Sequence, residues 1–94
     1  MSDRELLELA AKAAFDEFAD QMLQGGWNPL EDDGNALQLA VKMDLEIELT
    51  EDSAWANGIN VQNYQLFEWH HNDKCSATRR AIVRAAAEIG RAME

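Results

Sequence analysis

Residues 44–49, Asp44-Leu45-Glu46-Ile47-Glu48-Leu49, alternate strictly between acidic and aliphatic side chains. Because successive side chains of a strand point to opposite faces, this alternation predicts a β-strand. One face would carry the three aliphatic residues toward the core, and the other would carry the three carboxylates into water. The stretch therefore indicates a small sheet with helices on one face and solvent on the other.

Two helices are predicted before this strand. Ser2-Asp3-Arg4-Glu5 has the spacing of a capping box, and apolar residues recur at helical spacing from there to about Gln24. Gly25-Gly26 would end that helix, because glycine adopts the left-handed conformation of a C-terminal cap. A second, shorter helix is predicted over about residues 33–43, with Asp32 or Asp33 as its N-cap.

The chain after the acidic strand is predicted to complete the sheet and add a last helix. Asn57-Gly58 indicates a turn, so residues 51–58 should form a loop tip that carries Trp55. A second strand region is expected within residues 59–70, as one bulged strand or two short ones. A helix over about residues 74–93 would follow, capped by Asp73.

This order, α-α-β-β-α, predicts a single α+β domain over residues 1–94. Its small antiparallel sheet of two or three strands would pack against the helices.

Charge is distributed unevenly along the chain. Residues 1–73 hold sixteen acidic and three basic side chains, whereas residues 74–94 hold five basic and two acidic ones. The total of −10 disfavours direct binding to nucleic acid or to anionic membranes, and it favours basic protein surfaces. No apolar run is long enough to span a membrane, and a single cysteine excludes an internal disulfide, so a cytoplasmic location is expected.

Residues 68–75, Glu68-Trp69-His70-His71-Asn72-Asp73-Lys74-Cys75, concentrate groups that can ligate metals. A zinc site would combine His70, Asp73 and Cys75, but the chain has no Cys-x-x-Cys pair and no distant histidine partner. Cys75 also lacks an oxyanion loop and an orienting group for nucleophilic catalysis. The acidic residues 31–33 lack the spacing of a calcium loop. We therefore expect no metal site, no cofactor and no catalytic residue.

The last predicted helix carries three arginines within about one and a half of its turns: Arg79, Arg80 and Arg84. They could contact nucleic acid, but we expect them to pair with carboxylates of the first helix or of the sheet edge. In a homodimer the same helix would pack across a symmetry axis.

The acidic strand is the candidate binding surface. Residues on one face of a strand lie roughly 6.5–7 Å apart, a scale similar to the spacing of phosphates along a nucleic-acid strand. A row of exposed carboxylates could therefore occupy a basic groove. The alternative interpretation is that these residues only solvate the exposed face of the strand. No lysine ladder offsets their mutual repulsion. The predicted partner-binding residues are Asp44, Glu46, Glu48, Glu51, Asp52 and Trp55, with Trp55 as an exposed anchor.

Two stretches carry a resemblance to a known family. They are Trp27-Asn28-Pro29-Leu30-Glu31-Asp32-Asp33-Gly34, which continues into residues 36–42, and Ala77-Thr78-Arg79-Arg80-Ala81-Ile82-Val83-Arg84, which continues to Gly90. Together they resemble short proteins that phages and prophages of Gram-negative bacteria encode, related to the phage NinX-like family. The resemblance implies a phage origin and a bacterial host cell, and it carries over no catalytic residue.

The acidic net charge, the carboxylate row and the phage origin that the resemblance implies lead to one hypothesis. The chain would be a non-enzymatic phage protein that inhibits a host defence complex, of the anti-CRISPR or anti-defence type. Its acidic face would dock on a basic, nucleic-acid-binding surface of a host protein or nucleoprotein complex, without contacting nucleic acid or membrane itself. The alternative hypothesis is a small homodimeric phage accessory or assembly protein with no nucleic-acid mimicry.

Overall fold

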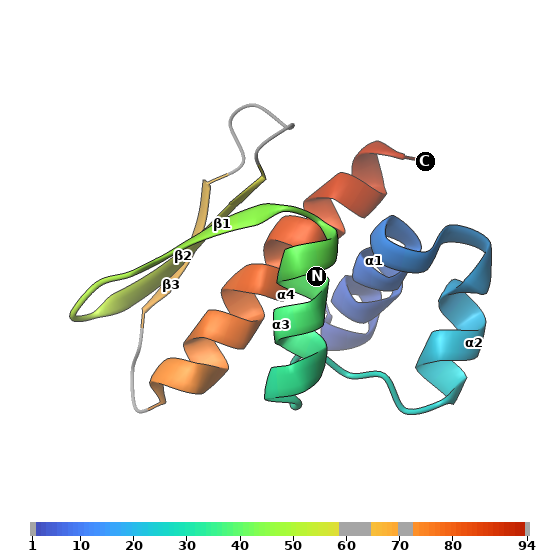
Figure 1. The fold of residues 1–94 in the computed structure, drawn as a ribbon, viewed down its shortest axis with the longest axis horizontal. Coiled ribbons are helices and arrows are strands. Elements are labelled where there is room, and N and C mark those ends of the chain that lie inside the picture. Colours follow the sequence, from blue (N-terminus) through green and yellow to red (C-terminus); the bar gives the residue numbers. More distant parts are fainter. Residues whose placement is uncertain (1, 59–64, 70–72, 94) are drawn as a thin grey trace.

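The computed structural model describes residues 2–58, 65–69 and 73–93. Within these ranges helices and strands form the predicted α+β fold, in which α4 is the central element. The sheet packs on one side of α4, and α1 and α3 pack on another (Figure 1). The elements are α1 (Asp3–Phe15), the 3-10 turn η1 (Asp16–Phe18), α2 (Ala19–Gln24), α3 (Asp33–Lys42), β1 (Leu45–Leu49), β2 (Ser53–Gly58), β3 (Gln65–Trp69) and α4 (Lys74–Ala92).

Small side chains on α4 allow this central position. On the sheet side, Ala81 and Ala85 form a buried cluster with Ala54 and Ala56 of β2. On the helix side, Val83 is buried in a larger cluster with residues of α1 and α3. Alanine keeps the layers close while it adds little side-chain entropy cost on burial. α4 is therefore buried on both of these sides and lies at the centre of the core.

The first predicted helix is interrupted, so the expectation of one helix to Gln24 is wrong. α1 ends where Asp16 adopts a left-handed φ of 47° and its N–H donates to the Lys12 carbonyl. The apolar periodicity continues through the break, which is why the spacing predicted one helix. Beyond it the chain returns so that Phe15 packs edge-on against the buried Trp27, with ring centroids 5.2 Å apart.

The sheet is an antiparallel meander in the order β1-β2-β3. β2 occupies most of the predicted loop tip 51–58, so that prediction is wrong. The actual turn lies earlier: the Thr50 N–H donates to the Ser53 carbonyl at 2.9 Å, and the Ser53 N–H donates to Thr50 Oγ1 at 3.0 Å. Of the predicted strand region 59–70, residues 65–69 form β3, and the rest lies outside the described residues.

The register shows which residues share each face of the sheet. Ile47 lies opposite Ala56 and Leu49 opposite Ala54, so the aliphatic residues of β1 lie on the face toward α4, as predicted. The burial of Ile47 and Leu49 was predicted wrongly, because α4 packs chiefly on β2 and the edge strand extends past it. Leu45 packs against the core, whereas Ile47 is 39% and Leu49 62% exposed.

Candidate binding surface

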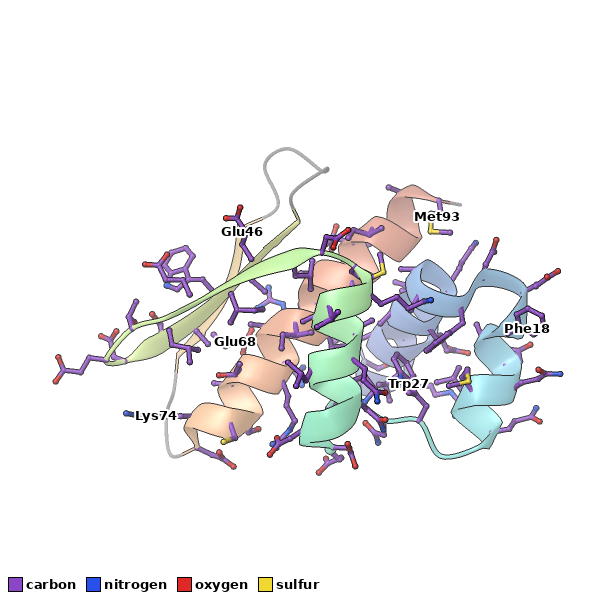
Figure 2. The ribbon with its side chains drawn as sticks, in the orientation of Figure 1. Phe18, Trp27, Glu46, Glu68, Lys74 and Met93 are labelled. Carbon is purple, nitrogen blue, oxygen red and sulfur yellow. The ribbon has the colours of Figure 1, made fainter. Side chains whose placement is uncertain are left out.

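The outer face of the sheet, away from α4, carries two exposed carboxylates of β1. Glu46 lies opposite Asn57 and Glu48 opposite Trp55 in the antiparallel register. Figure 2 shows Glu46 extending away from the helices. As same-face neighbours on one strand, the two glutamates are separated by about 6.5–7 Å along the backbone. This part of the predicted carboxylate row is therefore present as an exposed pair.

Asp44 does not continue this row, because β1 begins one residue later. It has a φ of 53° and lies in the turn after α3, where its N–H donates to the Val41 carbonyl at 3.2 Å. Aspartate tolerates this left-handed conformation better than most residues do. The tight turn thus takes Asp44 out of the strand that the alternation had assigned to it.

Glu51 and Asp52 lie at the tip of the β1–β2 hairpin and are exposed. The Thr50 hydroxyl lies 3.3 Å from an Asp52 carboxylate oxygen, so Asp52 takes part in the turn. The side chains of Glu46, Glu48 and Glu51 form no ion pair with any residue in the described part of the chain. The outer face and the hairpin tip therefore keep their negative charge.

Trp55 is half-buried on the central strand and is not a loop-tip anchor. Its indole N–H donates to Ser53 Oγ at 3.0 Å, and that hydroxyl lies 2.6 Å from the hydroxyl of Thr50. The ring is thereby tied to the hairpin turn, on the same face as Glu48. The structure therefore places Trp55 on the same face as the acidic pair.

The arginines of α4 pair with carboxylates away from the outer face of the sheet. The pairing of Arg80 with the first helix was predicted, whereas that of Arg79 with α3 was not. Arg79 donates to the Leu30 carbonyl at 2.8 Å and to Asp33 at 2.6 Å, and the Asp33 hydrogen bond raises the pKa of Arg79 above its ordinary value. Arg80 donates to Asp3 at 2.9 Å. These contacts bind α4 to the α3 segment and to the start of α1.

Glu68 is the sheet carboxylate that receives an internal partner. It lies opposite Ala54, on the face toward α4, and its side chain is 20% exposed. Arg84 donates a hydrogen bond to it, and Arg80 lies 3.9 Å away. Glu68, which has an ion pair, thus faces the helices. Glu46 and Glu48, which have no ion pair among the described residues, face away from them.

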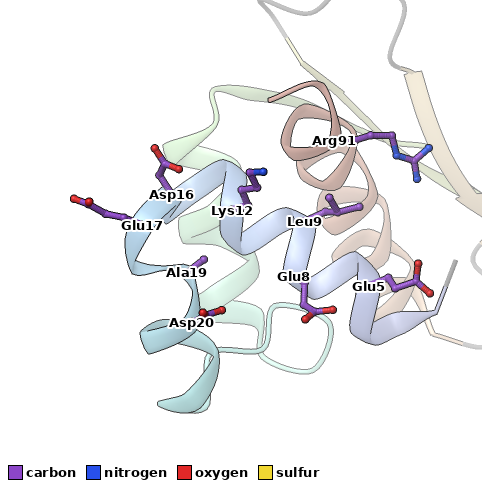
Figure 3. Close-up of a pocket in the computed structure, with 9 residues that line it drawn as sticks. All are labelled: Glu5, Glu8, Leu9, Lys12, Asp16, Glu17, Ala19, Asp20 and Arg91. Atoms are coloured by element: carbon purple, nitrogen blue, oxygen red, sulfur yellow. The ribbon is translucent and has the colours of Figure 1, made fainter. Parts of the chain in front are cut away.

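A second acidic region was not predicted from the sequence. The break after α1 creates a hollow of about 710 Å³ along α1, η1 and α2 (Figure 3). Its charged lining combines five carboxylates with two cations: Glu5, Glu8, Asp16, Glu17, Asp20, Lys12 and Arg91. A continuous helix would not have formed this hollow, and no sequence signal marked the break.

Within residues 2–56, 68 and 73–93, whose side chains are described, no group of three or more His, Cys, Asp and Glu residues is placed to hold a metal ion. His70 and His71 lie outside the described residues. Cys75 is exposed in the first turn of α4. No helix in the described part of the chain is long and apolar enough to cross a membrane.

Comparisons of the chain with protein-family models, with curated proteins and with solved structures find no match. The resemblance to phage NinX-like proteins stays a prediction that rests on the two stretches of sequence quoted above.

Proposed function

We propose that this chain is a non-enzymatic, phage-encoded protein that inhibits a host defence complex of the anti-CRISPR or other anti-defence type. Its acidic sheet face would occupy a basic surface on which the complex binds nucleic acid. One observation carries the proposal: Glu46, Glu48 and Glu51 are exposed and have no ion pair among the described residues.

The distribution of cations supports this choice of surface. Arg79, Arg80 and Arg84 are engaged with Asp33, Asp3 and Glu68, on the helical side of the sheet. The strands themselves carry no lysine or arginine, so the charged side chains that they place on the outer face are carboxylates. Negative charge on this face attracts a basic partner and raises the association rate, an effect that salt weakens. The exposed carboxylates also stay hydrated until hydrogen-bond donors of a partner replace the bound water.

The hydrogen bonds that tie Trp55 to the hairpin turn support the proposal as well. Trp55 lies across from Glu48 and is held to the turn through Ser53. A partly exposed aromatic ring beside carboxylates offers stacking and hydrogen-bond acceptance to arginine, which is the residue that basic nucleic-acid grooves use most. Little ordering would be needed on binding, since the hairpin is already fixed.

The decisive experiment is displacement of nucleic acid from a target. A protein captured by the immobilised chain from lysate of the bacterial host, after nuclease treatment, would be purified and loaded with fluorescent DNA or RNA. We expect added chain to release the labelled nucleic acid at low salt, and less so at high salt. Failure to release it from any captured protein would contradict the proposal.

A matched pair of variants separates the sheet face from net charge. Glu46→Gln/Glu48→Gln and Glu8→Gln/Glu17→Gln remove the same charge, but the second pair lies on the helical side. We expect the first to weaken displacement at least about tenfold, or about 1.4 kcal/mol, and the second to change it little. Equal losses would show that only total charge matters.

The homodimer hypothesis has less support. α4, which would pack across the symmetry axis, lies between the sheet, α1 and α3, and its arginines bind partners within the chain. A mass of twice 10.6 kDa by light scattering would favour the homodimer instead.

A further inference from the structure

The outer edge of β1 has no partner strand in the part of the chain that the structure describes, because β1 pairs only with β2. The Thr50 N–H points toward β2, to the Ser53 carbonyl. Backbone groups alternate in direction along a strand, so the N–H and C=O groups of Leu45, Ile47 and Leu49 point the other way. The edge thus presents a row of donors and acceptors to solvent.

The two sides of this edge differ in chemistry. On the outer face lie Glu46 and Glu48, which have no ion pair among the described residues. On the face toward α4 lie Ile47 and Leu49, both exposed. A strand added to this edge would place one set of side chains beside the carboxylates and the alternate set beside the aliphatic residues.

The helix that precedes β1 also exposes apolar side chains. Leu37 and Val41 lie one turn apart on α3 and are 65% and 67% exposed. α3 contacts β1, and both elements pack against α4. Exposed apolar side chains thus lie on both elements that precede the hairpin turn, α3 and β1.

We propose that the open edge of β1 binds an extended segment of the partner in which basic and aliphatic residues alternate. The segment would add as a fourth strand, with backbone hydrogen bonds for affinity and alternate side chains for specificity. This inference rests on the proposed function and specifies which part of a basic partner the acidic face engages. A bare nucleic acid could neither form the backbone hydrogen bonds of an added strand nor pack against the aliphatic residues.

The charges disfavour a second copy as the occupant. In an antiparallel pair of two β1 strands centred on Ile47, Glu46 of one chain would lie opposite Glu48 of the other. Like charges directly opposite destabilise a strand pair, and both sites would be affected. A basic segment in the same place would instead pair opposite charges at both positions. The complementarity therefore selects a different chain.

Two heptapeptides of identical composition and charge test the inference. One alternates, Lys-Val-Lys-Val-Lys-Val-Lys, and the other is blocked, Lys-Lys-Lys-Lys-Val-Val-Val. We expect the labelled alternating peptide to bind the 94-residue chain at least tenfold more tightly by fluorescence anisotropy at physiological salt. Equal affinities, or no binding of either peptide at millimolar concentration, would overturn strand addition.

A backbone substitution provides the second test. Ile47→Pro removes an N–H that points to the open edge and leaves the hydrogen bonds to β2 in place, as proline does in natural edge strands. We expect it to abolish the preference for the alternating peptide. Ile47→Thr keeps the N–H and is the matched control, which should retain the preference. If circular dichroism shows that Ile47→Pro is unfolded, Leu49→Pro removes an outward N–H near the end of the strand.

The outcomes separate this inference from the proposed function. Peptide preference without displacement of nucleic acid from any target would support the edge site and contradict the inhibitor. Displacement that depends on Glu46 and Glu48 but ignores Ile47→Pro, with equal peptide affinities, would support the inhibitor and overturn the edge site.

Discussion

Gly90 of α4 lies against the backbone of Leu9 in α1, so that a Cβ at position 90 would overlap the Leu9 carbonyl oxygen and lie 2.9 Å from the carbonyl carbon. Backbone atoms of a packed helix cannot move aside as a flexible side chain can. The two helices therefore approach as closely as they do because this position has no side chain.

Gly90→Ala should destabilise the protein by about 1–3 kcal/mol, the usual cost of overpacking. Helix propensity alone would predict a gain of about 1 kcal/mol, so the sign of the change tests the contact. Urea unfolding followed by tryptophan fluorescence measures it. Gly25→Ala, where the nearest backbone oxygen would lie 3.4 Å from the new Cβ, is the control and should change stability little. A more stable Gly90→Ala variant would contradict the observed packing.

Asp32→Ala should cost about 1 kcal/mol, the usual loss for an N-cap. The Asp32 carboxylate accepts the Asn35 N–H at 2.8 Å at the start of α3. Thermal unfolding checks the prediction, with Glu31→Ala as a control that removes an adjacent, exposed carboxylate. Equal losses in the two variants would mean that charge near the helix end matters more than the cap itself.

The Arg84–Glu68 pair should couple β3 to α4. A double-mutant cycle of Arg84→Met and Glu68→Gln should give an interaction energy of about 0.5–1 kcal/mol, because both side chains are partly exposed and solvent screens the pair. Arg84→Met alone should cost more than the double variant, since it leaves Glu68 without this donor. A coupling energy near zero would show that solvent satisfies Glu68 equally well.

Glu46→Lys/Glu48→Lys should associate with the unmodified chain, although each protein alone stays monomeric. Antiparallel pairing of their β1 strands would set lysine opposite glutamate at both positions. Light scattering on the mixture at low and high salt measures this, and salt should weaken it. The matched Glu8→Lys/Glu17→Lys variant has the same net charge. Equal association of that variant would indicate attraction between whole molecules and no strand pairing.

Helix starts could be predicted from the sequence because their causes are local. Ser2 accepts the Glu5 N–H at 3.2 Å, and Asp73 accepts the Ser76 N–H at 3.1 Å, each within three residues. The α+β class could be predicted for the same reason. The spacing of apolar residues, every two in a strand and every 3.6 in a helix, can be read within a short stretch of the chain.

The hairpin was misplaced for an equally local reason. Thr50 closes the turn through its side chain, with bonds to Ser53 at 3.0 and 3.1 Å, and without a glycine. Asn57-Gly58 carried the stronger turn signal but lies at the end of β2. Trp55 was consequently predicted at a loop tip, whereas it lies on the central strand beside the candidate surface.

The sequence by itself determined the caps, the helix and strand periods, and the supply of carboxylates in β1. Only the tertiary structure decided which carboxylates receive a partner. Arg79 and Asp33 are 46 positions apart in the chain, and Arg80 and Asp3 are 77 apart, so their meeting depends on how the helices pack around α4. Glu46 and Glu48 lack such a partner among the described residues because helices cover only one face of the sheet, and the pleat points these two residues to the other face.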